Sequence, residues 1–360
     1  MSVEYVTLDS GTATESYLSL FADCFPETVG ASLCTASHYE WKYGTSGKSA
    51  PPLEYAGYED GRLVSYYAGL PFRYSVNGSP VPGSLVCDVM THSSMRGRGI
   101  FTAMGRFATD RMAEREIAFC TGFTIRPSVI PGHLKVGWRI AFDLPVYCRI
   151  VDVRVILAAK GMSLIGSILQ PFAATYANLC RLRSGRTGKN LRCREYTLED
   201  FLLQEDYAGF YAQWCRQNPN HLIRTEEFLK WRLSAPGLQY RIVTLHDAER
   251  LAGLAIVRNT RSPGFEVIGI ADLMILREYA SGSGLLHDEL ASLAKRSGAA
   301  GVTVMCSVPE AELLHLAASG YIRTPYKFQF IAKWLAPGDA PSCLWDARKW
   351  HLMWLDADTI

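Results

Sequence analysis

The pattern of apolar and polar positions is clearest in the middle of the first half of the chain. Residues 84–91 are rich in β-branched and apolar side chains around one carboxylate, which predicts a buried strand. Residues 99–116 predict a helix, and residues 117–123 the next strand. The helix carries apolar side chains at helical spacing at Phe101, Met104, Ala108 and Met112. A short helix then begins near Pro127 and ends at Gly137. The alternation indicates an α/β fold with a mixed sheet of the α+β kind.

A glycine-rich turn, Arg96-Gly97-Arg98-Gly99-Ile100, joins the first strand to the helix. Such a turn directs several backbone N–H groups and the positive end of the helix dipole at one point, and the arginines add charge. The pattern therefore predicts an anion site. A Walker loop needs Gly-Lys-Ser/Thr at its end, and a dinucleotide fingerprint needs three glycines and a later acidic residue. Neither spacing is present.

The segment Arg96-x-x-Gly99, preceded by Val89-x-Thr91-His92, resembles the acyl-CoA pyrophosphate loop of the GNAT N-acetyltransferase superfamily. The usual loop has Gly or Ala two residues after its second glycine, where this chain has Phe101. The resemblance implies acetyl-CoA or another acyl-CoA as co-substrate. Its phosphates would bind residues 96–101, namely Arg96, Gly97, Arg98, Gly99, Ile100 and Phe101. Val89, Met90 and Thr91 would pair with the pantetheine through their backbone, as an added strand does, and polarise the thioester carbonyl.

A second stretch strengthens the resemblance. Residues 132–138, Gly-His-Leu-Lys-Val-Gly-Trp, are similar to the Tyr-x-Lys-x-Gly-Phe signature of the same superfamily, which flanks the thiol end of CoA. In that register His133 takes the place of the tyrosine often used as general acid. A histidine with a pKa near neutrality is suited to exchange a proton with the amine or the leaving thiolate. The resemblance covers about residues 3–150.

The two halves of the chain look alike, which predicts tandem GNAT-like domains. Five blocks recur in the same order at near-constant spacing. They pair Trp41 with Trp231, Gly61-Arg62-Leu63 with Glu249-Arg250-Leu251, Asp88 with Asp272, Gly97-Arg98-Gly99 with Gly282-Ser283-Gly284, and Gly137-Trp138 with Gly320-Tyr321. We expect a catalytic acyl-CoA-binding domain at 1–150, a connector at 151–195, a second domain at 196–335 and a tryptophan-rich tail at 336–360.

The second domain is expected to be degenerate. Where the first loop has Arg96 and Arg98, the second has Ser281 and Ser283, so the charges that would pair with phosphate are missing. Two roles stay open for this domain. It completes the acceptor pocket, which we favour, or it only stabilises the first domain.

The connector is strongly apolar from Val155 to Leu179 and is followed by a basic stretch. That stretch contains Arg181, Arg183, Arg186, Lys189, Arg192 and Arg194. Apolar helices followed by basic residues are compatible with an anionic membrane surface. The interpretation we prefer is a pair of connector helices packed on both domains, followed by a solvated loop. The three tryptophans of the tail, Trp345, Trp350 and Trp354, are expected to dock on a domain surface.

Composition narrows the function classes. The 360 residues are 48% hydrophobic and 20% charged, which is typical of a globular chain long enough for two cores. A net charge of +2 gives no support for a nucleic-acid partner. The ten cysteines form no CxxC pair, so reduced thiols are expected, and no metal-ligand spacing is present. No signal peptide or spanning segment is expected, and we predict a cytoplasmic location.

Several side chains are candidates for proton transfer. Asp88 lies on the strand beside the expected thioester, although Asp272 at the equivalent place in the second half favours a shared structural role. Asp143 is a further carboxylate. His92 is expected to cap the loop more than to act as a base, and His133 has the best position. The catalytic candidates are therefore His133 and Asp88.

These features predict a CoA-dependent N-acyltransferase that works by direct attack in a ternary complex. Similar two-domain chains occur in bacterial surface-polysaccharide biosynthesis, so the resemblance implies an amino sugar, free or nucleotide-linked, as the amine acceptor. Two alternatives stay open. One is an acyltransferase acting on an amino acid or another small amine, and the other is a non-catalytic acyl-CoA-binding protein.

Overall fold

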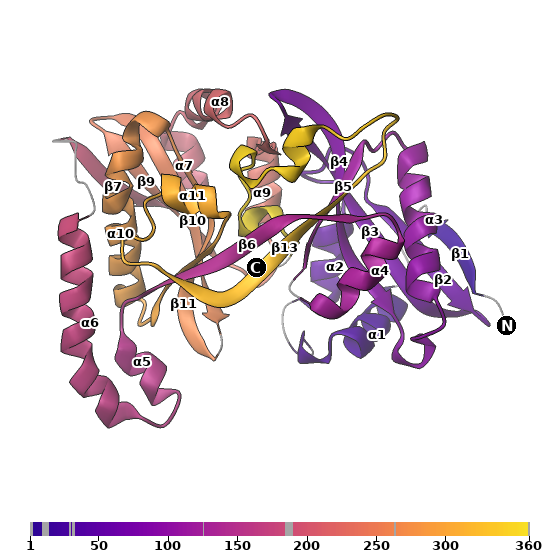
Figure 1. Cartoon of the computed structure of the whole chain (residues 1–360), viewed down its shortest axis with the longest axis horizontal. Helices are drawn as coiled ribbons and strands as arrows, with labels where there is room; N and C mark the ends of the chain where they lie inside the picture. The colour runs from indigo at the N-terminus through magenta and orange to yellow at the C-terminus, as the bar shows by residue number, and fades with distance from the viewer. Residues whose placement is uncertain are drawn as a thin grey trace. The chain divides into compact units, whose positions relative to one another are not determined.

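The computed structural model describes residues 3–8, 14–28, 30, 33–124, 126–183, 190–262 and 264–358. Its contacts divide the chain into two compact units (Figure 1). Unit 1 consists of Met1–Phe142, His221–Leu238 and Gln329–Asp346. Unit 2 consists of Asp143–Asn220, Gln239–Phe328 and Ala347–Ile360. Both units are discontinuous in sequence, so they do not follow the boundaries at residues 150, 195 and 335 that the sequence suggests.

Unit 1 is built on a sheet with the strand order β1-β2-β3-β4-β5-β13, and β8 pairs with β3. Neighbouring strands run antiparallel except β4 and β5, which are parallel. The strands are β1 (Glu4–Leu8), β2 (Leu53–Glu59), β3 (Arg62–Val76), β4 (Ser79–Thr91), β5 (Phe119–Thr124), β8 (His221–Leu222) and the end of β13 (Ile322–Trp334). Its helices are α1 (Thr14–Cys24), α2 (Ala36–Tyr43), α3 (Ile100–Glu114), α4 (Ile130–Lys135) and α9 (Glu226–Leu233).

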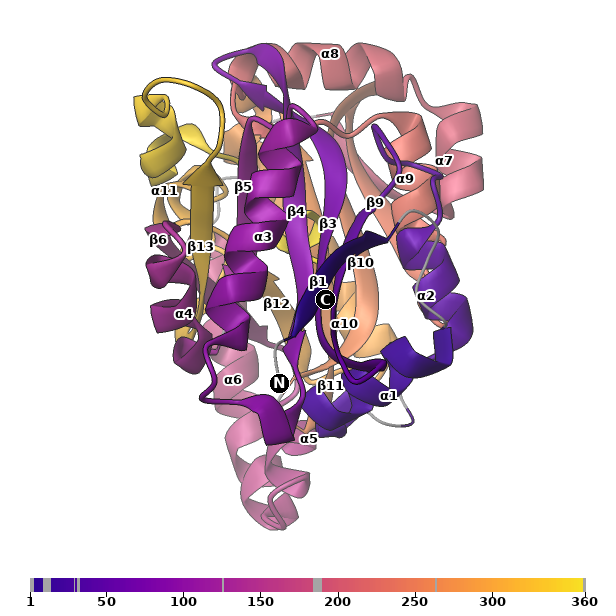
Figure 2. The ribbon, with the colours of Figure 1, turned by 90° about the vertical axis from the view of Figure 1, so that its right-hand side faces the viewer.

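The core of unit 1 lies between α3 and the sheet. Met104, Ala108 and Met112, which the sequence places on the apolar face of this helix, are all buried, and they pack in one cluster with Val86 of β4. Figure 2 shows α3 running along the strands of this sheet. Because side chains alternate along a strand, the next residue, Cys87, points the other way and contacts Tyr43 of α2. Helices α2 and α3 therefore cover opposite faces of β4.

Unit 2 repeats much of this arrangement. Its sheet has the order β6-β12-β11-β10-β9-β7, with β11 and β12 parallel. The strands are β6 (Arg139–Ile150), β7 (Leu191–Tyr196), β9 (Tyr240–Asp247), β10 (Arg250–Ser262), β11 (Phe265–Ile275) and β12 (Gly301–Met305). The helices are α5 (Val153–Ala158), α6 (Ser163–Arg183), α7 (Leu198–Gln204), α8 (Tyr207–Gln217), α10 (Ser283–Arg296) and α11 (Val308–Leu313). None of the helices in the described ranges combines the length and the hydropathy needed to span a bilayer.

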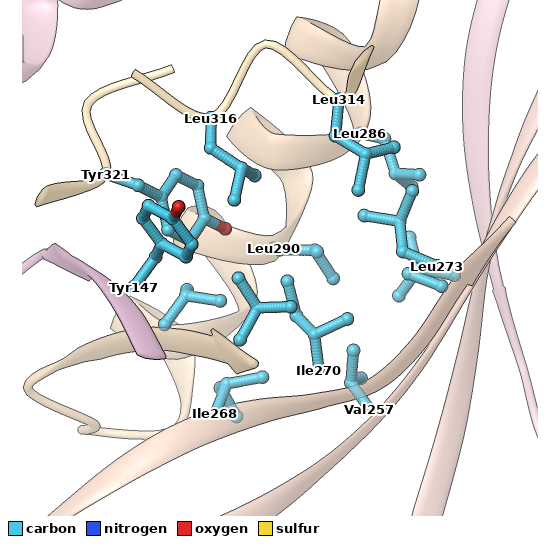
Figure 3. Close-up of a cluster of buried hydrophobic side chains, with 14 of the residues drawn as sticks. Tyr147, Val257, Ile268, Ile270, Leu273, Leu286, Leu290, Leu314, Leu316 and Tyr321 are labelled. Carbon is cyan, nitrogen blue, oxygen red and sulfur yellow. The ribbon is translucent and has the colours of Figure 1, made fainter. Parts of the chain in front are cut away.

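The core of unit 2 is one large cluster between α10 and its sheet (Figure 3). Leu286 and Leu290 of α10 pack against Ile268 and Ile270 of β11, and all four side chains are fully buried. Two tryptophans of the tail, Trp350 and Trp354, are also buried. The tail of unit 2 is therefore part of its packed structure.

Two strands cross from one unit to the other. β13 begins in unit 2, but its last residues, Gln329 to Trp334, belong to unit 1 and pair antiparallel with β5. β6 begins in unit 1, and its residues Val146 to Ile150 pair antiparallel with β12 in unit 2. Unit 1 thus contains β8 and the end of β13 from the second half of the sequence, and unit 2 contains most of β6 from the first half. The pattern of a single segment does not reveal such long-range pairing.

Candidate active site

The predicted glycine-rich turn lies between β4 and α3. β4 ends at Thr91, a short 3-10 turn follows at Ser93–Met95, and α3 begins at Ile100. Gly97 and Gly99 both have φ of 79°, in the left-handed region that favours glycine. Gly99 is the N-cap of α3, and no side chain caps this end of the helix. The first backbone N–H groups of α3, together with its dipole, can therefore bind an anion.

A cavity of about 630 Å³ opens at this helix end. Its lining includes Thr91 at the end of β4, the loop residues Arg96, Gly97 and Gly99, and the first residues of α3, Ile100, Phe101 and Thr102. Arg126, after β5, and Lys135, at the end of α4, also line the cavity. The Thr91 hydroxyl is buried and has no hydrogen-bond partner in the described part of the chain. Three cations, free N–H groups and an unsatisfied hydroxyl suit an elongated polyanion such as the phosphates of CoA.

The structure does not place Arg98 in this cavity. Its guanidinium donates to Glu59 Oε1 of β2 at 2.8 Å and lies 2.9 Å from Met95 Sδ, and the residue is absent from the cavity lining. The expectation that Arg98 pairs with phosphate is therefore not supported by the position of its side chain. The sequence pattern could not show this, because the partner of the Arg98 guanidinium is the Glu59 carboxylate, 39 positions earlier in the chain.

Arg126 and Lys135 take the place expected of Arg98, and the sequence analysis did not select them. Arg126 follows the end of β5 and also pairs with Glu27, while its guanidinium lies over the Phe25 ring. Lys135 is the last residue of α4. Two features of the sequence could have indicated them. Arg126 follows shortly after the strand β5, and Lys135 lies inside the second motif at residues 132–138.

The bulky Phe101 is accommodated by a glycine on α4. A Cβ added at Gly132 would lie 2.5 Å from the Phe101 ring, so any larger residue at position 132 would clash with it. Both residues line the cavity. The departure from the usual loop therefore has a local compensation.

The end of β4 separates from β5 beside the cavity. The parallel pairing covers Gly83 with Phe119 through Leu85 with Thr121, although both strands continue beyond it. Residues Val89, Met90 and Thr91 lie past the last of these pairs, while the opposite edge of β4 stays paired with β3. The edge of β4 that faces β5 can therefore pair with an extended ligand, as expected for the pantetheine arm.

Asp88 lies at a bulge of β4, with φ of 48° in the left-handed region. Its carboxylate is buried and accepts hydrogen bonds from Tyr17 at 2.6 Å, Tyr43 at 2.5 Å and Lys42 at 2.9 Å. Burial alone would raise the pKa of Asp88, but Lys42 and the two tyrosine hydroxyls outweigh it and hold the pKa below its usual value. An ionised carboxylate with three donors is well suited to holding the bulge and poorly suited to accepting a proton.

His133 lies in an apolar environment that lowers its pKa. It lies on α4, is buried, and packs edge-to-face on Phe101 and Trp138 at centroid distances of 5.1 and 5.2 Å. Burial lowers its pKa to about 4, so the ring is neutral at physiological pH. This environment favours a packing role, and a catalytic role for His133 stays a prediction.

The two other candidates have clear partners. His92 caps the turn before the glycines, because its Nδ1 accepts from the backbone N–H of Ser94, as expected for a capping histidine. Asp143 belongs to unit 2 and forms an exposed ion pair with Lys327 at 2.7 Å.

A further cationic group was missed by the sequence analysis. Lys48 lies in the loop after α2, with its Nζ 4.1 Å from the centroid of the Trp231 ring. Burial lowers the pKa of Lys48 to about 7, so it titrates near neutrality. Trp231 itself stacks on Trp41 at 5.0 Å, and each indole N–H donates to the backbone carbonyl of the other tryptophan. The loop depends on a residue from α9, which lies far away in sequence.

Comparison with known proteins agrees with this geometry. Residues 10–141 match the family model of the acetyltransferase (GNAT) domain. A GCN5-related N-acetyltransferase from Anabaena variabilis matches at 14% identity with a TM-score of 0.63, over 92% of this chain and 73% of that one. A probable N-acyltransferase of unknown function from Enterococcus faecalis matches at 12% identity with a TM-score of 0.62, over 93% of this chain and 73% of that one. No curated protein sequence matches the chain.

Saccharomyces cerevisiae N-myristoyltransferase, solved with bound myristoyl-CoA, has the same fold. It matches at 12% identity with a TM-score of 0.60, over 92% of this chain and 79% of that one. The predicted α/β class with a mixed sheet is confirmed, and the chain has the fold of the GNAT acyltransferases. At these identities the structural likeness defines the fold alone.

Proposed function

We propose that this protein is an acyl-CoA-dependent N-acyltransferase whose cofactor site lies in unit 1. The observation that carries the proposal is the cavity at the N-terminus of α3, which combines uncapped backbone N–H groups with Arg96, Arg126 and Lys135. The GNAT domain match at residues 10–141 supports the same site, because it covers the glycine-rich turn and the second motif.

In this proposal the cofactor follows β4. The pyrophosphate binds the N–H groups of residues 97–102 and the three cations, and the Thr91 hydroxyl supplies a polar contact where β4 ends. The pantetheine then pairs with the edge of β4 at Val89 and Met90 that β5 leaves unpaired. A backbone N–H of this segment is placed to polarise the thioester carbonyl.

The reaction is a direct transfer. The nitrogen of a neutral amine attacks the thioester carbonyl, the C–S bond breaks, CoA leaves as a thiolate, and the proton from nitrogen passes to a base or to the thiolate. We assign Asp88 to positioning, because its lone pairs already accept from Lys42, Tyr17 and Tyr43. We assign His133 to packing, because its ring is enclosed by Phe101 and Trp138.

The acceptor is a small primary amine, and an amino sugar, free or nucleotide-linked, is the acceptor we propose. This rests on the resemblance of the chain to tandem enzymes of surface-polysaccharide biosynthesis. An amino acid or another small amine is the second acceptor class to test. In the same proposal, the second half of the chain is a GNAT-like partner that has lost its own cofactor site.

The test measures release of free thiol from acetyl-CoA, and from a longer acyl-CoA, against a panel of amino sugars and amines. Calorimetry should give one CoA per chain. Arg96→Ala should weaken CoA binding by roughly 10- to 100-fold, as one charge-assisted contact is lost. Arg98→Ala is the matched control and should change it less than about 3-fold, since Arg98 pairs with Glu59.

Two CoA molecules bound per chain would contradict the loss of a site in the second half. Equal effects of the two arginine variants would contradict the site geometry. Binding of CoA without thiol release for any amine would mark the chain as an acyl-CoA-binding protein.

A further inference from the structure

Helix α6 carries a stripe of large apolar side chains that is open to solvent. Leu164, Ile168 and Phe172 are 83%, 67% and 70% exposed, and Ile165 and Leu169 flank them. Their spacing of four residues places them on one side of the helix. Single exposed apolar residues are common, but a contiguous stripe of this kind marks an interaction surface. We call these five residues the α6 stripe.

The side of α6 opposite the stripe is packed against unit 2. The orientation of the stripe toward solvent is therefore set by these contacts. Gly166 lies against α5, where an added Cβ would be 2.9 Å from Arg154 Cα. The Gln170 side chain accepts from the Val153 N–H at 2.9 Å and donates to the Val151 carbonyl. Cys180 is buried and packs against Gly320. Figure 1 shows the α5–α6 hairpin extending beyond the sheet of unit 2.

This exposure differs from the packed connector that the sequence analysis preferred. The segment also has an unusual charge. Residues 152–194 contain eight Lys and Arg and one acidic residue, Asp152, although the whole chain has a net charge of only +2. Arg154 and Lys160, beside the start of α6, are exposed, and Arg154 pairs with Asp152. Arg192 and Arg194 of β7 pair with Glu249. No charged residue occurs between Gly161 and Cys180, so the stripe itself is uncharged.

An apolar face in a segment where basic residues far outnumber acidic ones is complementary to a lipid surface that carries negative headgroups. The same charge disfavours a second copy of the chain, because two such segments face to face would bring cations against cations. We propose that the α6 stripe binds the surface of an anionic membrane, with its apolar side chains in the interfacial region and the excess positive charge of its segment providing attraction to the headgroups.

The experiment is sedimentation of the full chain with vesicles of phosphatidylcholine containing 30% phosphatidylserine, compared with phosphatidylcholine alone. The protein should pellet with the anionic vesicles, and raising the salt to about 0.5 M should release most of it, because headgroup attraction is screened. Leu164→Asp combined with Ile168→Asp and Phe172→Asp should lower the apparent partition coefficient at least tenfold.

Leu203→Asp is the matched control, since Leu203 is 85% exposed on α7 and lies outside the stripe. It should leave vesicle binding unchanged. Failure of the wild-type chain to pellet with anionic vesicles would overturn the proposal without reference to any variant. Equal binding by the triple variant would overturn it too, and so would a wild-type dimer, detected by light scattering, that the triple variant converts to monomer.

Discussion

Asp88 in unit 1 and Asp272 in unit 2 occupy positions that the sequence repeat pairs, and both are buried beside a cation. The partner of Asp88 is Lys42 of α2, at 2.9 Å. The partner of Asp272 is His351 of the tail, at 2.8 Å, and Nδ1 of this histidine lies 2.9 Å from Glu310. The cations come from unrelated parts of the chain. The carboxylate position is thus shared by the two units, while the way its charge is neutralised is not.

The loops that follow these carboxylates differ more strongly. In unit 1, nothing lies within 4 Å of a Cβ added at Gly97 or Gly99, and the loop opens into the cavity. In unit 2, a Cβ at Gly282 would lie 2.5 Å from Leu191, and the buried Ser283 hydroxyl donates to the Leu314 carbonyl. The second loop is packed where the first is open. A carboxylate shared by a unit with an open loop and a unit with a packed loop favours a structural role for both Asp88 and Asp272.

Removing the cation of unit 1 should have the largest effect. Lys42→Met leaves the buried Asp88 carboxylate without its charge partner, which should cost about 3–5 kcal/mol of stability. Lys42→Met with Asp88→Asn should recover part of this loss, because no unpaired charge remains. Urea unfolding measures both. Lys230→Met, which removes an exposed lysine of α9, is the control and should change stability by less than about 1 kcal/mol.

If the double variant kept its stability but lost turnover at unchanged CoA affinity, Asp88 would have to take part in the chemistry. The comparison with Asp272 would then be misleading.

Alkaline pH should weaken the ion pairs of His351 with Asp272 and Glu310 in unit 2 and leave the Lys42–Asp88 pair of unit 1 intact. Burial alone would lower the pKa of His351, but Glu310 and Asp272 outweigh it and raise the pKa to about 9. The charged form of His351 therefore contributes on the order of 3 kcal/mol to the free energy of unfolding. This contribution is complete below the unfolded pKa of about 6.5 and is lost as pH rises through 9. The pKa of Asp88 is lowered, so its contribution is lost only as acid pH falls through the folded value.

The measurement is the stability difference between wild type and His351→Gln from pH 6 to 10. It should shrink across this range, whereas the corresponding difference for Asp88→Asn should stay constant. A His351 difference that does not vary with pH would mean that this residue is not charged in unit 2.

The buried histidines give the smallest effect. His133 packs on Trp138 in unit 1 and His287 packs on Tyr321 in unit 2, two aromatic positions that the repeat also pairs. Burial lowers the pKa of each histidine to about 4. His133→Ala should lower the melting temperature, with a loss of about 1–2 kcal/mol, and change kcat by less than about 3-fold. A fall in kcat of roughly 10²-fold or more at unchanged stability would restore proton transfer to His133.

Local patterns predicted the strand at residues 84–91, the glycine-rich turn and the apolar face of α3, because each depends on neighbours in sequence. The residues that were missed or misplaced depend on distant partners. Glu59 takes the charge of Arg98 across 39 residues, and Lys42 reaches Asp88 across 46. Arg126 and Lys135 become part of the cavity only when α4 lies beside the loop. Periodicity carries no information about such contacts.

The crossing of β13 sets the order in which the chain can be built. Unit 1 receives its last strand, Gln329 to Trp334, only after the whole of β12 and α11 has been synthesised. On the ribosome the sheet of unit 1 therefore stays incomplete until the chain is nearly finished. Its newly made sheet has an unpaired edge at β5 during that time, and an unpaired edge is prone to association with other chains. Early pairing of β5 by the distant strand β13 is therefore impossible, and the edge of β5 stays open over more than half of the synthesis.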